Sequence, residues 1–455
     1  MHPRTWMALA AASSLAVLAA CDSPPPTRPS LSSSRRGDDA VSLASEVRTL
    51  AAARGIGPLP APPRVRRPLV LLGQALAFDK IISGNRDISC MTCHLPRFAT
   101  GDARRLPIGD GGIGLGPQRV LGSGRVIPRN APPAFNPYAM TSMFWDGRVS
   151  VDAQGHFHTP AGAQLTPAMT KTLQFGAVSA QPLFPPTARD EMRGFSGNEL
   201  AAIPDDSVDA IWGAIMKRLG RIPQYRAMFE AAYPGTKFRD MNFAYASNAI
   251  AGFLVSDLYM NQSPWDRFLA GDDRALTPAQ LNGAKQFLSL KCSICHNGPA
   301  FSDGKFHNVA LRQFGPGKGN GPTGTDDFGR FNVTGDPADK YAFRTTPLRN
   351  VDLTGPYGHA GEFTNLRDFV AHYSNSAQNL ADYDPNQLEP DLRGTLLDNV
   401  DDILATRDTI IAGVVLPDSV IDALTTYLHA LTDPRAQNLS HLTPRRVPSG
   451  LPVDR

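Results

Sequence analysis

The sequence lacks the features that would place it among membrane-spanning, nucleic-acid-binding or disulfide-stapled proteins. After residue 21 it has no run of about 20 apolar residues, the length that a membrane-spanning helix requires. The formal net charge is only +3 and no basic run is interleaved with aromatic residues, so we expect no nucleic-acid partner. Cysteines number only five in 455 residues. With 42% hydrophobic and 19% charged residues, the composition is that of a globular protein with two or three domains.

The first 21 residues have the pattern of a bacterial lipoprotein signal peptide. Arg4 precedes a short apolar stretch that ends in Leu18-Ala-Ala-Cys21. We expect residues 1–21 to be a signal with Cys21 lipidated, so that the lipid alone holds the protein on the periplasmic side of a bacterial membrane. The alternative is an ordinary secretion signal with an incidental cysteine. Residues 22–65, rich in Pro, Ser, Arg and Ala, are predicted to be a flexible tether.

The other four cysteines form two Cys-x-x-Cys-His units, Cys90-Met-Thr-Cys93-His94 and Cys292-Ser-Ile-Cys295-His296. Disulfides are the first expectation in an exported protein, but a histidine directly after each pair indicates covalent c-type haem attachment. Two thiols reach the two vinyl groups of one porphyrin, and the next imidazole binds its iron. A four-cysteine zinc site would leave the histidines unexplained, and a thioredoxin-like pair would need one unit, not two. We therefore predict two covalently bound haem c groups.

An internal repeat supports two related haem domains. Gly73-Gln-Ala-Leu-Ala-Phe78 precedes the first unit, and Gly283-Ala-Lys-Gln-Phe287 precedes the second. Apolar spacing predicts helices over residues 208–219, 243–258, 276–290 and 420–431, whereas the Gly- and Pro-rich segments 102–135 and 314–340 predict long loops. The expected fold is mainly α, with two cytochrome c-like haem domains over residues 66–262 and 263–435, followed by a tail over 436–455.

From about residue 69 to about residue 432 the sequence resembles the bacterial di-haem cytochrome c peroxidase family, which includes the methylamine-utilisation enzyme MauG. Each matching motif is modest alone, but their number and order are specific. The motifs are Ser89-Cys-Met-Thr-Cys-His94, Pro128-Arg-Asn130, Phe144-Trp-Asp-Gly-Arg148, Glu191-Met192, Ser263-Pro-Trp-Asp-Arg267, Cys292-Ser-Ile-Cys-His296, Asp327-Phe-Gly-Arg330, Phe343-Arg-Thr-Thr-Pro-Leu-Arg-Asn350 and Leu353-Thr-Gly-Pro-Tyr-Gly-His359.

The resemblance implies an enzyme whose N-terminal haem reacts with hydrogen peroxide and whose C-terminal haem takes electrons from a small cytochrome c or cupredoxin. His94 and His296 match the proximal iron ligands, and Trp145 matches a relay between the haems. Further matches are Glu191 to the distal glutamate and Gln181 to the distal glutamine. The family's calcium ion would be held by the Asn130 side chain and the backbone carbonyls of Thr354 and Pro356, oxygen donors that suit this hard cation. Family members are often dimers, which leaves a homodimer open.

Two departures from the peroxidase pattern bear on mechanism. Residues 95–155 contain no histidine, so the second histidine that peroxidases place on the resting N-terminal haem is missing. We predict a five-coordinate N-terminal haem; the alternative is that His156 or His158 folds back onto it. At the other haem, the family's distal methionine is replaced by Tyr373, as in MauG. A phenolate favours ferric iron, whereas methionine raises the potential; the alternatives are that His372 binds or that nothing does.

Three functions follow from these residues. The first is a peroxidase that reduces hydrogen peroxide to water with electrons from a small periplasmic redox protein. The second is a MauG-like enzyme that uses peroxide to oxidise residues of a partner protein. The third is a non-catalytic two-haem electron carrier, which would keep two strong axial ligands on each iron. The sequence offers no evident His or Met candidate beside Glu191 and Gln181, and this argues against the carrier.

Overall fold

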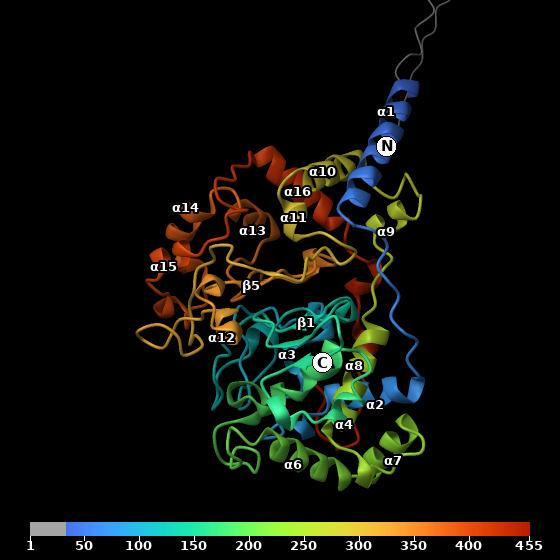
Figure 1. The fold of residues 1–455 in the computed structure, drawn as a ribbon, viewed down its shortest axis with the longest axis vertical. Helices are drawn as coiled ribbons and strands as arrows, with labels where there is room; N and C mark the ends of the chain where they lie inside the picture. The colour runs from blue at the N-terminus through green and yellow to red at the C-terminus, as the bar shows by residue number, and fades with distance from the viewer. Residues whose placement is uncertain (1–32) are drawn as a thin grey trace, which may run out of the picture.

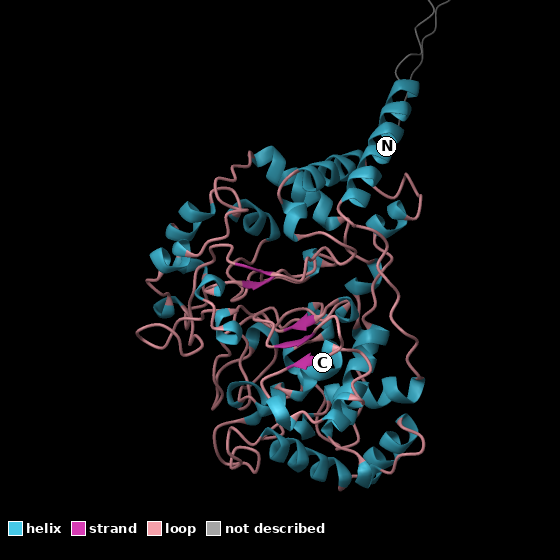
Figure 2. Cartoon of the chain, in the orientation of Figure 1, coloured by secondary structure: helices cyan, strands magenta, loops and turns pink. Residues whose placement is uncertain are grey.

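The computed structural model describes residues 33–455, with side chains from residue 42; the expected signal peptide and Cys21 lie outside this range. The described chain is mainly helical, which confirms the predicted fold class (Figure 2). None of its helices is both long and apolar enough to cross a bilayer. The helices are α1 Ser33–Ala53, α2 Arg67–Phe78, α3 Cys90–Cys93, α4 Pro167–Thr170, α5 Ala177–Ala180, α6 Val208–Gly220, α7 Pro223–Ala232, α8 Phe243–Asp257, α9 Pro264–Leu269, α10 Pro278–Ser289, α11 Cys292–Cys295, α12 Phe331–Thr334, α13 Leu366–His372, α14 Ser376–Ala381, α15 Val400–Ala405 and α16 Asp418–His429.

The chain forms two lobes with short strands between them. Figure 1 shows α2–α8 in one lobe (the N-terminal lobe) and α9–α16 in the other (the C-terminal lobe). The N-terminal lobe contributes an antiparallel sheet in the order β1-β2-β3, and the C-terminal lobe an antiparallel pair of β4 with β5. The strands are β1 Ser142–Met143, β2 Val149–Val151, β3 Phe157–His158, β4 Phe306–His307 and β5 Phe343–Arg344.

The internal repeat corresponds to the same helix crossing in each lobe. In the N-terminal lobe α2 packs across α8, and in the C-terminal lobe α10 packs across α16. A Cβ on Gly73 would lie 1.8 Å from the carbonyl oxygen of Ala249 in α8. Likewise, a Cβ on Gly283 would lie 2.0 Å from that of Ala423 in α16. Only glycine permits backbones to approach so closely, so the repeated glycines fix equivalent crossings just before the two Cys-x-x-Cys-His units.

The four predicted helices are confirmed as α6, α8, α10 and α16. The Thr277 hydroxyl caps α10 by accepting a hydrogen bond from the backbone N–H of Gln280, as its position before Pro278 predicts. Ser207 precedes α6, but its side chain makes no capping hydrogen bond.

The prediction of a flexible tether over residues 22–65 is wrong for residues 44–59. In α1, Ala44, Val47 and Ala51 are buried in the core of the C-terminal lobe, and the chain beyond them buries Ile56 and Leu59. α1 packs against α10, one end of which it passes in Figure 1. Spacings of three and four residues put the buried α1 side chains on one helix face, and no proline interrupts residues 33–53. Average composition over a long segment hid this amphipathic helix.

The C-terminal tail, residues 436–455, is also packed rather than free. It returns to the N-terminal lobe, where Figure 1 places the C-terminus, and buries Leu439, Leu442 and Val447 in that lobe's core. Asp454 lies 2.7 Å from the ammonium of Lys80 and accepts a 2.5 Å hydrogen bond from the hydroxyl of Thr92. The core of each lobe is therefore completed by a distant segment of the chain: α1 packs into the C-terminal lobe, and residues 436–455 pack into the N-terminal lobe.

Candidate functional site

The two Cys-x-x-Cys-His units form equivalent single-turn helices, α3 and α11, each followed by its histidine. The Nδ1 atoms of His94 and His296 lie 3.0 and 2.9 Å from the carbonyl oxygens of Thr100 and Phe301, respectively. A carbonyl oxygen can only accept a hydrogen bond, so in the neutral imidazole Nδ1 carries the hydrogen and Nε2 keeps its lone pair. Burial lowers the pKa of both imidazoles and thus favours the neutral form that binds metals.

Each unit forms a wall of a large cavity. The first cavity, about 220 Å³, is lined by Cys90, Cys93 and His94. The second, about 360 Å³, is lined by Cys292, Cys295 and His296. None of these four cysteines is in a disulfide. Two free thiols beside an imidazole with a free Nε2, on a mainly apolar cavity, are the donor set that a c-type haem requires. The residues present therefore fit one haem per lobe.

Glu191 and Gln181 both line the first cavity, as the family pattern predicts. Glu191 lies in a π-helical turn, Arg189–Arg193, which is held by a hydrogen bond from the Asp110 backbone N–H to the Glu191 carbonyl oxygen at 2.8 Å. Burial raises the pKa of the Glu191 carboxyl, and the guanidinium of Arg148, 3.6 Å away, opposes this shift. A carboxyl with a raised pKa beside a guanidinium can both accept and release a proton.

Trp145 stands between the two cavities and lines both. Its indole N–H donates to the carbonyl oxygen of Asn130 at 2.9 Å, and only 9% of the residue is exposed. Phe144 before it has φ +66°, an uncommon left-handed conformation for a non-glycine residue. An aromatic ring shared by two cofactor-sized cavities is suitably placed for electron transfer between them.

A buried ion network connects the lobes beside Trp145. The guanidinium of Arg129 donates to Asp327 at 2.6 and 2.8 Å and to Asp146 at 2.6 Å. Burial alone would lower the pKa of Arg129, but these two carboxylates outweigh it and raise that pKa. Asp146 also pairs with Arg148 at 3.2 Å. The motifs containing these residues are visible in the sequence, but the pairing is not, because Asp327 comes from a loop of the other lobe.

The two candidate distal residues of the second cavity, Tyr373 and His372, differ in position. Tyr373 lines the cavity and His372 does not. The Nε2 atom of His372 lies 2.9 Å from the carbonyl oxygen of Val309, so this nitrogen already has a hydrogen-bond partner. Burial raises the pKa of the Tyr373 phenol, so without a bound cation the group stays protonated.

His156 and His158 do not reach the first cavity. Their side chains are 74% and 65% exposed and both contact the carboxylate of Asp152, at 3.1 and 3.3 Å. Of the histidines in the described part of the chain, His94 alone lines this cavity. The arrangement supports an N-terminal iron with no second histidine.

The expectation that no methionine stands beside the distal residues is wrong. Met192 directly follows Glu191 and, with Met140 and Met143, lines the first cavity. Met140 and Met143 come from the segment before Trp145 and are brought to the cavity by the fold. The case against a pure electron carrier therefore depends on Glu191 and Gln181, not on a lack of thioether ligands.

The predicted calcium ligands lie around the second cavity. Asn130, Thr354 and Pro356 all line it. The side-chain N–H₂ of Asn130 donates to the carbonyl oxygens of Arg104 and Arg105 at 2.9 and 3.0 Å, so Oδ1 is its remaining donor to a cation. These are neutral oxygens, and calcium at this place stays a prediction.

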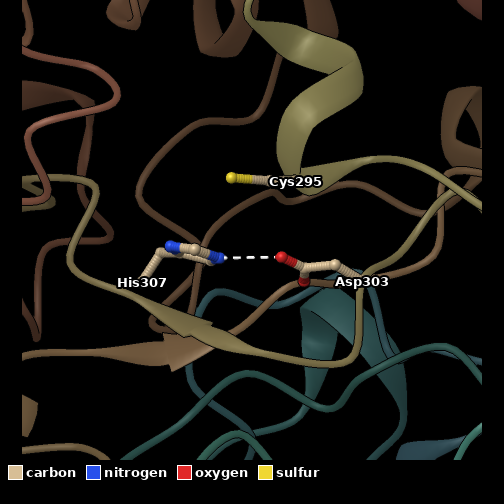
Figure 3. Close-up of side chains that lie close together, drawn as sticks. All are labelled: Cys295, Asp303 and His307. Carbon is tan, nitrogen blue, oxygen red and sulfur yellow. Dashed lines mark hydrogen bonds and ion pairs between the residues drawn. The ribbon is translucent and has the colours of Figure 1, made fainter. Parts of the chain in front are cut away.

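A cluster that the sequence analysis did not single out lies on the wall of the second cavity. Figure 3 shows Cys295, Asp303 and His307 turned toward one another. The imidazole of His307 also contacts Asp408 at 2.5 Å, opposite Asp303 at 3.0 Å. Hydrogen bonding to Asp303 is the largest cause that raises the pKa of His307 to about 11. We do not assign a metal here, because a protonated imidazole cannot bind one and the Cys295 sulfur is needed for thioether formation.

Comparison with known proteins gives consistent matches. Residues 67–274 match the family described as di-haem cytochrome c peroxidase. The cytochrome c551 peroxidase of Pseudomonas aeruginosa is 31% identical over 310 residues, covering 67% of this chain and 71% of that protein. The methylamine utilization protein MauG of Paracoccus denitrificans is 28% identical over 396 residues, covering 82% and 90%.

Solved structures share the fold. A MauG-like protein associated with microbial copper homeostasis superposes with a TM-score of 0.59 at 24% identity, covering 85% of this chain and 96% of that one. The diheme peroxidase BthA from Burkholderia thailandensis gives a TM-score of 0.57 at 21% identity, covering 86% and 91%.

Proposed function

The chain belongs to the di-haem cytochrome c peroxidase family, an oxidoreductase family with two haem c groups, and on that premise we propose that it reduces hydrogen peroxide to water. The electrons would come from a small cytochrome c or cupredoxin. The observation that carries this proposal is the position of Glu191, a carboxyl with a raised pKa on the cavity of the first haem unit. A pure electron carrier has no use for such a group.

The overall reaction consumes one H₂O₂, two protons and two electrons and yields two H₂O. A haem held by Cys90, Cys93 and His94 would supply the iron at which the O–O bond is reduced. The Glu191 carboxylate would take the proton from one peroxide oxygen and return it to the other, which leaves as water. The Gln181 amide, on the same cavity, would orient the peroxide by hydrogen bonding.

Electrons would enter at the second haem, held by Cys292, Cys295 and His296, and cross to the first through Trp145. The ring's position on both cavities supports this route.

We also propose a periplasmic location with a lipid on Cys21, and a calcium ion bound by Asn130, Thr354 and Pro356. The backbone carbonyl of Asn130 accepts the hydrogen bond from the Trp145 indole, so an ion bound by Asn130 would also help to hold Trp145 in position.

The first test is one equivalent of hydrogen peroxide added to the fully oxidised protein, with the haem spectrum followed in milliseconds. We expect an immediate change without prior reduction, because in residues 33–455 no histidine besides His94 lines the first cavity. A spectrum that stays constant until one electron is supplied would contradict the five-coordinate N-terminal haem. Steady turnover with a reduced cytochrome c then tests the peroxidase itself.

Tyr373 favours a second candidate, a MauG-like enzyme that oxidises residues of a partner protein. A phenolate ligand would disfavour the ferrous state of the second haem and so its use as an electron entry point. The two functions are separated by comparing oxidation of a reduced cytochrome c with oxidation of a tryptophan-bearing partner protein, detected by mass spectrometry. Peroxide-dependent partner oxidation without cytochrome turnover would replace the first proposal by the second.

A further inference from the structure

The partition between the two cavities contains one charged side chain. The residues that line both cavities are Asn130, Pro133, Trp145, Arg344 and Pro347. Arg344 is thus the cation shared by the two cofactor sites, and it is only 8% exposed.

Arg344 is fixed across the lobe boundary. It lies in β5 of the C-terminal lobe, paired with β4. Its backbone N–H donates to the Trp145 carbonyl oxygen at 2.8 Å, and its side-chain Nε–H donates to the Phe144 carbonyl oxygen at 3.1 Å. These two bonds anchor Arg344 to the backbone of Phe144 and Trp145, and the Nε bond restricts where the other nitrogens of its guanidinium lie.

The buried Nη1 atom of Arg344 has no hydrogen-bond partner. A buried guanidinium without an anion is costly, and burial lowers its pKa to about 10. Asp146 attracts it from a distance, but that carboxylate is already bonded to Arg129 and Arg148. An anion is therefore expected at Nη1 when the site is complete.

The other cationic side chains that line the two cavities are either paired with carboxylates or exposed to solvent. Arg129, Arg148 and His307 already contact carboxylates. Lys291 and Lys318 are exposed to solvent. A tetrapyrrole of the haem type carries two propionate carboxylates, which are the anions that two haems would bring into these cavities.

We propose that Arg344 is the positioning residue that binds a haem propionate at the partition and adds positive charge beside the cofactor. This inference depends on the two-haem assignment, not on which reaction the enzyme catalyses. A nearby positive charge stabilises the ferrous form relative to the ferric form, which has one more positive charge. Arg344 would thus raise the midpoint potential of the haem whose propionate it binds.

Equilibrium redox titration of the purified two-haem protein tests this. We expect Arg344→Gln to lower the midpoint potential of at least one haem, and Arg344→Lys to keep most of the native value because the charge remains. Arg330→Gln is the matched control: Arg330 also bridges the lobes by donating to the carbonyl oxygens of Asp146 and Gly147, at 2.9 and 3.2 Å, but lines neither cavity. It should leave both potentials unchanged.

Native potentials in Arg344→Gln, or an equal fall in Arg344→Lys and Arg344→Gln, would overturn the proposal. If the Gln variant loses haem, a crystal structure of the native two-haem protein decides: a propionate oxygen hydrogen-bonded to Nη1 supports it, and any other partner of Nη1 overturns it. Peroxide turnover is measured separately. A two-haem protein without turnover refutes the proposed function and leaves the Arg344 result standing.

Discussion

At the scale of single residues, the proposed peroxide reduction in the first cavity depends on the carboxyl group of Glu191. We expect Glu191→Gln to lower kcat for peroxide reduction by about 10²- to 10⁴-fold, the usual contribution of a positioned acid–base group. The control is Asp190→Asn, because Asp190 is the neighbouring carboxylate and does not line the cavity. Steady-state turnover with a reduced cytochrome c measures both variants, and an unchanged kcat in the Gln variant would refute the assignment.

The pH dependence of kcat/KM provides a second test of Glu191. Burial raises the pKa of this carboxyl, with Arg148 opposing the shift. The ionised form must accept the first proton, so activity should fall as pH drops through the pKa of Glu191. Because that pKa is raised, the fall should begin above the pH range of an unperturbed glutamate, whose pKa is about 4.3. The remaining activity of Glu191→Gln should not show this fall at low pH. If the fall persists in that variant, it is caused by the titration of another group.

Tyr373 lines the second cavity and is the proposed distal ligand of its haem. We expect Tyr373→Met to raise the midpoint potential of the second haem, because a thioether favours ferrous iron more than a phenolate does. Redox titration measures the shift. The control is Tyr357→Phe, which removes the hydroxyl of another tyrosine on the same cavity. A Tyr373→Phe variant with native potential and spectrum would show that the phenol is not a ligand.

At the scale of elements, Gly73 and Gly283 permit the close helix crossings, α2 on α8 and α10 on α16, that precede the two Cys-x-x-Cys-His units. We expect Gly73→Ala to lower the free energy of unfolding by about 1–3 kcal/mol, the usual cost of overpacking, because its Cβ would meet the Ala249 carbonyl oxygen. Gly213→Ala in α6 is the control, since nothing lies within 4 Å of the added Cβ. That change should stabilise by about 0.5–1 kcal/mol through helix propensity. Denaturant titration measures both; equal effects would contradict the crossing argument.

The features that could be predicted from the sequence are those that depend only on residues close together in the chain. The two Cys-x-x-Cys-His units, the cap at Thr277 and the four amphipathic helices need only neighbouring residues to be recognised, and the structure contains each helix. The wall between the cavities could not be predicted in this way. Trp145 and Arg344 lie far apart in the sequence, and their contact depends on how the two lobes dock.

The errors have physical causes of the same kind. The α1 segment was grouped with its proline-rich neighbours, although Ala44, Val47 and Ala51 have helical spacing and a lobe to pack against. Met140 and Met143 carry no local signal of a cavity position, because their place on the cavity wall depends on the tertiary fold. Sequence resemblance identified which residue types matter, and tertiary packing determined which of them meet.

At the scale of the whole molecule, the two lobes exchange the ends of the chain. α1 completes the core of the C-terminal lobe, and the C-terminal tail completes that of the N-terminal lobe. Both exchanged ends lie near a haem unit: α1 packs on α10, which leads into α11, and Asp454 bonds to Thr92 within α3. Loss of either end should therefore affect one haem unit more than the other.

The C-terminal tail allows this selectivity to be measured. Asp454→Ala would leave the partly buried ammonium of Lys80 without its partner and the buried Thr92 hydroxyl without its acceptor. We expect the N-terminal lobe to lose about 1–3 kcal/mol of stability, the usual cost of leaving a buried polar group without its hydrogen bond. Haem attachment at Cys90 and Cys93 should fall in consequence.

Mass spectrometry of proteolytic peptides can count haem at the two motifs separately, in protein produced with the native haem-attachment machinery. Attachment at Cys292 and Cys295 should be unchanged in Asp454→Ala, because the tail contacts the other lobe. Arg455→Ala is the matched control, since Arg455 is exposed and bonds only within the tail, to the Arg445 carbonyl oxygen at 2.9 Å. Equal loss at both motifs would mean that the tail stabilises the molecule as one unit, and the lobes could then not be treated as separately completed haem sites.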